Sequence, residues 1–164
     1  LRAHAHNVYD MATVMALVNR DLSADTASSD FATLFYGVLN GPQRRFTYAN
    51  AGHVPPLLLR GGRHSYLDSG GFMLGVEPGG TWDYDSFVLE RGDVVLAYTD
   101  GLNEAMNFED EMFGRERVTA AALAAVELGR DAQGIAKHVL WEMRRFAGLQ
   151  KRFDDITIVA VNVE

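Results

Sequence analysis

The spacing of apolar residues along the chain changes from helical to strand-like and then returns to helical. Asp10 precedes apolar residues at helical spacing, which predicts a helix from Met11 to about Leu22. The part that follows is typical of short strands separated by turns, and the last third returns to helical spacing before a final strand. Strands are predicted at 31–39, 45–51, 57–60, 64–67, 81–89, 94–98 and 156–163, and two further helices at about 115–128 and 132–147.

This order of elements predicts an α+β fold. Short turns such as Asn40-Gly41-Pro42 join many of the strands, and such turns connect antiparallel neighbours. We therefore expect a layered sandwich of two mostly antiparallel sheets flanked by helices. A chain of 164 residues is long enough for a sizeable core, and we expect one domain over residues 1–164.

Two strands are apolar on both faces and have acidic residues at one end. The strand 94–98 leads into Asp100-Gly101, and the final strand begins directly after Asp154-Asp155. If these strands are antiparallel neighbours, Asp100 meets Asp154 and Asp155 at one rim of the sheet. Oxygen ligands of this kind suit Mg²⁺ or Mn²⁺, and Gly101 leaves room for a hydrated ion or a phosphate. The alternative is that these aspartates only cap turns at strand ends.

Composition excludes several classes of protein. A net charge of −7 disfavours general nucleic-acid binding, because such binding requires Lys and Arg to neutralise phosphates. No cysteine is present, which excludes disulfides and thiolate zinc sites and fits a cytoplasmic location. No apolar run approaches the length of a membrane span, so no membrane contact by this domain is expected.

Other charged groups leave alternatives open. The basic cluster Arg144, Arg145, Lys151 and Arg152 either places favourable charge at a helix C-terminus or contacts a phosphate or phosphopeptide beside Asp154. The acidic residues Glu104 and 109–111 are expected to form a solvated loop, with a third metal or a partner contact as the alternative. We also consider 102–113 a candidate lid, because it is long and polar. His4 and His6 have a spacing that could bind a metal on a strand, but their segment is more typical of a helix end.

Several motifs then occur in an order that resembles a known family. They are Asn50-Ala51-Gly52-His53-Val54-Pro55-Pro56, Leu74-Gly75, Arg91-Gly92-Asp93, Tyr98-Thr99-Asp100-Gly101-Leu102-Asn103-Glu104-Ala105, Phe113-Gly114 and Asp154-Asp155-Ile156-Thr157. From about residue 10 to the end, this ordered set resembles the SpoIIE/RsbU-type branch of the PPM metal-dependent (protein phosphatase 2C-like) serine/threonine phosphatases.

The resemblance implies a fold, a reaction and a partner. The fold is an α/β-β/α sandwich with two Mg²⁺ or Mn²⁺ ions at one rim of the sheets. The reaction is hydrolysis of phosphoserine or phosphothreonine on a protein, by water activated between the two ions. The usual partner in this branch is a phosphorylated STAS-domain protein that antagonises an anti-sigma factor.

The resemblance also implies roles for individual residues. Asp100 and Asp154 match catalytic metal-ligand positions, and Asp155 matches a neighbouring metal position that is often Asn in the family. Asn50, His53 and Gly101 are assigned to substrate binding. For His53 the alternative is a loop histidine bonded to backbone, and Asn50 is expected to hold that turn.

One element of the family pattern is absent from this sequence. Family members carry a strand with an Asp and an Asp-x-x-Gly-His-Gly segment before the first helix ends, and Leu1 already lies beyond that point. We therefore expect a missing N-terminal hairpin, impaired phosphatase activity, and a homodimer that covers unpaired strand edges. Alternative functions are a non-catalytic module that binds a STAS-like partner, and a phosphate sensor with a single divalent ion.

Overall fold

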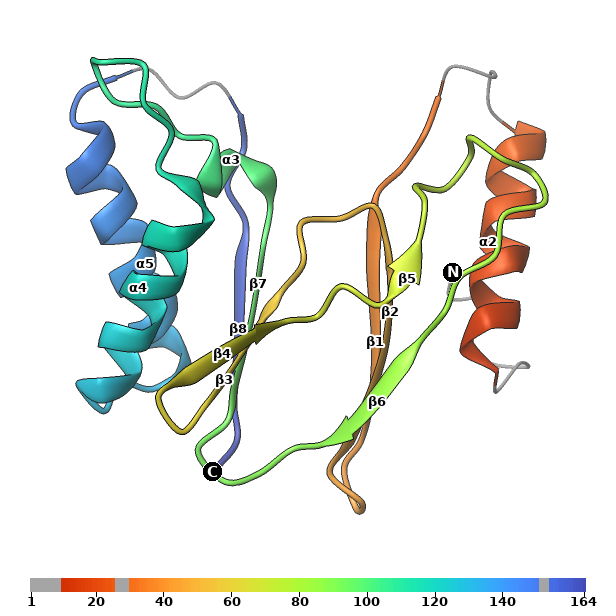
Figure 1. Ribbon diagram of the computed structural model, residues 1–164, viewed down its shortest axis with the longest axis horizontal. Coiled ribbons are helices and arrows are strands. Elements are labelled where there is room, and N and C mark those ends of the chain that lie inside the picture. The colour runs from red at the N-terminus through yellow and green to blue at the C-terminus, as the bar shows by residue number, and fades with distance from the viewer. Residues whose placement is uncertain (1–9, 26–29, 151–153) are drawn as a thin grey trace. The chain divides into compact units, whose positions relative to one another are not determined.

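The structure is a computed structural model that describes residues 10–25, 30–150 and 154–164. Its helices and strands, drawn in Figure 1, fall into two compact units, each made of segments that are not contiguous in sequence. The first unit comprises Leu1–Pro55 and Leu67–Leu89, and the second comprises Pro56–Tyr66 and Glu90–Glu164. The predicted single domain stays a prediction.

The first unit combines one helix with a four-stranded sheet. Helix α2, Met11–Asp25, begins where predicted, because the Asp10 carboxylate accepts a hydrogen bond from the Thr13 amide at 2.8 Å, and it ends beyond the expected Leu22. The strands are β1 (Leu34–Asn40), β2 (Arg45–Ala51), β5 (Gly70–Gly71) and β6 (Asp85–Val88). β2 pairs antiparallel with β1 and β6 and parallel with β5.

The two faces of this sheet differ in composition. One face packs Ala49 and Ala51 against Met11 and Met15 of α2, and Figure 1 shows the helix along that face. The other face carries the aromatic side chains of Phe35, Phe46, Tyr48 and Phe87, with ring centroids 5.5 to 6.4 Å apart. The strand predicted at 31–39 begins only at Leu34. Phe31, the first residue of the predicted strand, lies outside β1 and is exposed, although it is apolar.

The second unit contains a four-stranded antiparallel sheet in the order β4-β3-β7-β8. Its strands are β3 (Leu57–Arg60), β4 (Arg63–Tyr66), β7 (Val94–Tyr98) and β8 (Ile158–Asn162). The predicted pairing of the two acidic-ended strands is confirmed, since β7 and β8 run antiparallel with Tyr98 opposite Ile158.

Helices cover one face of this second sheet (Figure 1). They are α3 (Asp100–Asn103), α4 (Gly114–Glu127) and α5 (Ala132–Ala147). α5 matches its predicted bounds, because Asp131 caps its start by accepting from the Gly134 amide at 2.7 Å and Gly148 ends it at a φ of 61°. It buries Ile135, Val139 and Met143.

The final strand departs from its prediction. Its apolar residues on both faces indicated burial on both sides, but Val159 and Val161 are 53% and 43% exposed. The cause is the position of β8, which comes last in the order of its sheet among the described strands. The predicted α+β fold with two mostly antiparallel sheets and flanking helices is confirmed. Within the described part of the chain, no helix is both long and apolar enough to cross a membrane.

Candidate functional site

The candidate site is the junction where β7 ends and the segment before β8 begins. Thr99, the first residue after β7, joins these two segments through three hydrogen bonds. Its amide donates to the Thr157 carbonyl oxygen at 3.1 Å. Its hydroxyl accepts from the Thr157 amide at 2.9 Å and donates to the Asp155 carbonyl oxygen at 3.1 Å. The junction therefore holds Asp154 and Asp155 against the residues that follow Thr99.

Gly101 lies at the closest approach of the two segments. A Cβ atom at this position would lie 2.6 Å from the carbonyl oxygen of Asp155 and 3.3 Å from the Cβ of Asp154. The first distance is shorter than real Cβ contacts, so a larger residue would force the backbones apart. The absent side chain thus makes room for the opposite backbone, whereas the sequence argument assigned that room to an ion or a phosphate.

Three exposed aspartates, Asp100, Asp154 and Asp155, flank this contact along the chain. Asp100 is the first residue of α3, and its carboxylate accepts from the Gly101 amide at 3.0 Å. The Asp154 carboxylate accepts from the Asp155 amide at 2.7 Å. Both carboxylates keep further acceptor positions, since each oxygen carries two lone pairs.

The donor set agrees in kind with a divalent cation site. Oxygen ligands suit Mg²⁺, which proteins often bind through one or two carboxylates while water and substrate phosphates complete the shell. Among the described residues, however, no group of three or more His, Cys, Asp and Glu side chains could hold a metal ion. Asp100, Asp154 and Asp155 would therefore depend on additional ligands such as water or phosphate.

An ion pair between the half-exposed Arg60 and the buried Asp93 fixes the other end of β7. Asp93, which is 1% exposed, accepts hydrogen bonds from Arg60 Nε at 2.9 Å and from the Glu90 amide at 2.7 Å. These bonds connect β3 to the turn before β7 and explain the Arg91-Gly92-Asp93 motif. Because the turn is fixed, β7 carries Asp100 on a strand anchored at its start.

Tyr98 directly precedes the junction along the chain. It is the last residue of β7, is 2% exposed, and its hydroxyl has no hydrogen-bond partner within the described part of the chain. Burial raises the pKa of Tyr98 to about 12, with the nearby Tyr66 adding to the effect. Tyr98 is therefore neutral at physiological pH.

Asn50 and His53 belong to the first unit, whereas the carboxylates belong to the second. Asn50 is buried and holds its turn as expected: its side chain accepts from the His53 amide at 2.8 Å and donates to the His53 carbonyl oxygen at 3.0 Å. A ring nitrogen of His53 lies 3.1 Å from the Val54 carbonyl oxygen. These contacts agree with the structural alternative for both residues, and their assignment to substrate binding stays a prediction.

The segment predicted as a polar lid is more ordered than its sequence indicated. Leu102 and Phe113 are buried at its two ends. Between them, Met106 and Met112 form a bridge, and the Asn107 side chain accepts from the amides of Glu109 and Glu111 at 2.9 Å each. The acidic run is exposed, in agreement with a solvated loop. Movement of this segment as a lid stays a prediction.

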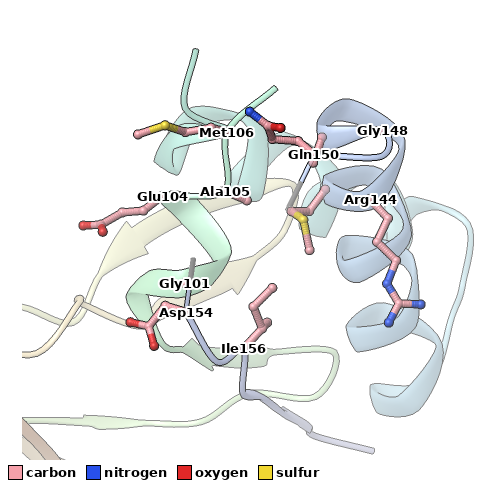
Figure 2. A pocket seen from close by; sticks show the side chains of 11 residues that line it. Gly101, Glu104, Ala105, Met106, Arg144, Gly148, Gln150, Asp154 and Ile156 are labelled. Carbon is pink, nitrogen blue, oxygen red and sulfur yellow. The ribbon is translucent and has the colours of Figure 1, made fainter. Parts of the chain in front are cut away.

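Sequence reasoning missed two features of the site. It did not single out Thr99, although a threonine between a buried strand and Asp-Gly was a usable signal. It also missed a pocket beside the junction that Asp154 and Arg144 both line (Figure 2). Of the basic cluster, Arg145 pairs with Glu142 at 2.6 Å. Lys151 and Arg152, like the candidate pair His4 and His6, lie outside the described residues.

Comparison with known proteins extends these observations. The family described as Stage II sporulation protein E (SpoIIE) matches over residues 1–164. Protein IcfG from Synechocystis sp. is 34% identical over 132 residues, which cover 80% of this chain and 20% of IcfG. Phosphoserine phosphatase RsbU from Bacillus subtilis is 27% identical over 152 residues, which cover 90% of this chain and 44% of RsbU. The chain thus spans less than half the length of these relatives.

A solved structure supports the same relationship. The RsbU and RsbW domains of Rv1364c from Mycobacterium tuberculosis superpose with a TM-score of 0.78 at 27% identity, over 97% of this chain and 43% of that one. The similarity in sequence and in fold confirms the resemblance that the ordered motifs indicated.

Proposed function

Because the chain belongs to the SpoIIE family, as a phosphatase domain of the RsbU/SpoIIE kind within the PPM phosphatases, we propose that it is a metal-dependent protein serine/threonine phosphatase domain. One structural observation carries this proposal. The hydrogen bonds of Thr99 hold Asp154 and Asp155 beside Asp100-Gly101, so carboxylates 54 positions or more apart in sequence share one rim.

Each residue at the rim has a role in the proposed mechanism. Asp100 and Asp154 would hold Mn²⁺ or Mg²⁺, with Asp155 as an additional ligand. The bound cations would supply the positive charge that activates water and stabilises the phosphoryl oxygens. Thr99 and Gly101 position the carboxylates through the backbone contact. Attack by water in line on phosphorus would release the serine or threonine hydroxyl without a covalent enzyme intermediate.

We further propose a phosphorylated STAS-domain protein, an antagonist of an anti-sigma factor, as the substrate. Similarity to phosphoserine phosphatase RsbU and to a structure with RsbU and RsbW domains supports this choice. We also propose that the 164-residue chain by itself is an impaired catalyst. Among the described residues, no group of three or more His, Cys, Asp and Glu side chains could hold a metal ion, so the metal shell at the rim depends on further ligands.

Calorimetric titration with MnCl₂ tests the metal site. We expect the chain to bind Mn²⁺ and the D154N variant to bind it at least about 10-fold more weakly, because an anionic ligand is lost. D110N is the matched control, since Asp110 is an exposed loop residue whose φ of 58° Asn tolerates.

Two results would contradict the proposal. Absence of Mn²⁺ binding by the unmodified chain would favour a non-catalytic module that binds a STAS-like partner. Equal weakening by D154N and D110N would place the ion away from the rim. Phosphoserine-protein hydrolysis in the same buffer tests the impairment, because turnover equal to that of an intact homologue would exclude it.

A further inference from the structure

The pocket beside the carboxylates has a built apolar interior. It encloses about 280 Å³ between α3, the segment that follows α3, and the last turn of α5. Gly101 and Asp154 line it on the side of the rim, and Met106, Met143, Ala147 and Ile156 supply apolar surface (Figure 2). This volume lies just below the roughly 300–1,000 Å³ of small-molecule sites, so it suits a side chain better than a whole ligand.

Charge is distributed unevenly around this pocket. Glu104 and Asp154 lie on the side of the rim, and Arg144 lies on the side of α5 (Figure 2). Arg144 is exposed and forms no ion pair with any acidic residue that the structure describes, whereas the adjacent Arg145 pairs with Glu142. A chain with a net charge of −7 therefore presents a cation at the far side of the pocket.

Exposed apolar residues continue the same surface. Phe108 is 69% exposed, and its ring lies 3.4 Å from the point where a Cβ on Gly148, a lining residue, would be. Leu149, the next residue, is 95% exposed. Contiguous exposed apolar surface with a polar rim is typical of a site where another molecule binds.

We propose that this pocket binds an apolar side chain of the phosphorylated substrate segment, while Arg144 pairs with an acidic residue of the same segment. The inference rests on the phosphatase function proposed above, because that function places the phosphorylated residue of the substrate at the acidic rim. Gly101 and Asp154 belong to both the rim and the pocket. An extended peptide advances about 3.3–3.6 Å per residue, so a side chain a few positions from the phosphorylated residue reaches the pocket. The pocket would therefore select substrates by sequence.

A binding experiment tests this without requiring turnover. Fluorescein-labelled phosphoserine peptides with a Gly/Ser background carry one Leu at each position from −4 to +4, and anisotropy gives their dissociation constants. We expect Leu at one or two positions on the same side of the phosphoserine to improve affinity about 5- to 10-fold over the Gly/Ser peptide. The gain is modest because the loss of conformational entropy on binding offsets part of the free energy of burying the Leu side chain. An added Glu next to that Leu should improve affinity again.

Two variants with matched controls locate the effect. A147L fills the pocket and should reduce the Leu preference below about 2-fold, which is near the limit of detection. A120L places the same side chain on the exposed face of α4 and should keep the preference. R144Q should remove the gain from Glu, and R130Q, in the exposed loop between α4 and α5, should keep it.

A measurement on the unmodified chain guards against misfolded variants. Methyl NMR of the methionines should show shifts at Met106 and Met143 when the Leu peptide is added and smaller shifts with the Gly/Ser peptide. The inference is overturned if no Leu position improves affinity, if A147L keeps the preference, or if these methyl signals do not move.

The two proposals fail separately. Loss of Mn²⁺ binding with a retained Leu preference contradicts the phosphatase function and leaves the pocket in place. Mn²⁺ binding that depends on Asp154, together with equal affinity for all peptides, contradicts only the pocket.

Discussion

Thr99 shows how much one side chain contributes to this site. The meeting of Asp100 and Asp154 at one junction was predictable from sequence, because antiparallel pairing of β7 and β8 brings the end of one strand to the start of the other. Their role as metal ligands stays a prediction. The position of Thr99 was a usable signal, but its partners were not predictable, since its hydroxyl bonds to Asp155 and Thr157, more than fifty positions away. Such a contact depends on strand register, which local sequence does not encode.

The T99V variant tests the contribution of this hydroxyl. Valine keeps the shape and the strand propensity but leaves the Thr157 amide and the Asp155 carbonyl without their partner. We expect a loss of about 1 kcal/mol in the free energy of unfolding, at the lower part of the range because both groups are near solvent. Urea denaturation measures it.

T157V is the matched control for this prediction. The Thr157 backbone takes part in the junction, but its exposed side chain does not. Equal destabilisation by T99V and T157V would show that the hydroxyl of Thr99 is not the group that joins the segments.

At the scale of elements, the sequence predicted most of the second unit. β3 and α5 have their expected bounds, because turn residues and an N-cap aspartate mark them locally. The helix α3 was missed, since Asp100–Asn103 is too short to show a helical period. The two-residue strand β5 was missed for the same reason, as only its pairing with β2 defines it.

G101A tests the close contact between α3 and the segment before β8. In a helix, Ala normally stabilises relative to Gly by up to about 1 kcal/mol. Here the added Cβ would meet the Asp155 carbonyl oxygen, so we expect a net loss of about 1–3 kcal/mol, the usual cost of overpacking. Thermal or urea unfolding gives the sign directly.

G79A provides the comparison for this substitution. A Cβ on Gly79 meets nothing within 4 Å, so its effect on stability should be small. A G101A protein as stable as G79A would mean that the two segments are not in contact at Gly101.

At the scale of the whole chain, noncontiguous segments build each unit. The segment Pro56–Tyr66 belongs to the second unit, although it lies in sequence between the two segments of the first unit. No local sequence pattern indicates this arrangement. Among the described strands, the sheet of the second unit also ends in β8, whose exposed Val159 and Val161 contradict the expected burial on both faces. An apolar strand at the end of a sheet invites pairing with another chain, and the homodimer stays a prediction.

V161K tests self-association through β8. Lysine on an edge strand opposes pairing, so we expect the dimer dissociation constant to rise at least about 10-fold, equivalent to 1.4 kcal/mol. Analytical ultracentrifugation over a concentration series measures this. L128K is the control, because Leu128 is 65% exposed at the end of α4, away from any strand. A chain that is monomeric at every concentration would contradict the predicted dimer.

The contact between Thr99 and Thr157 closes a loop of 58 residues that contains both α4 and α5. Closing so long a loop costs conformational entropy, and formation of the helical hairpin within it reduces the number of flexible residues in the loop and therefore that cost. A chain nicked at Gly129, between the two helices, would carry Asp100 on one fragment and Asp154 on the other. Assembly of the acidic rim would then become a bimolecular event, and Mn²⁺ binding at the proposed site would appear only when both fragments are present.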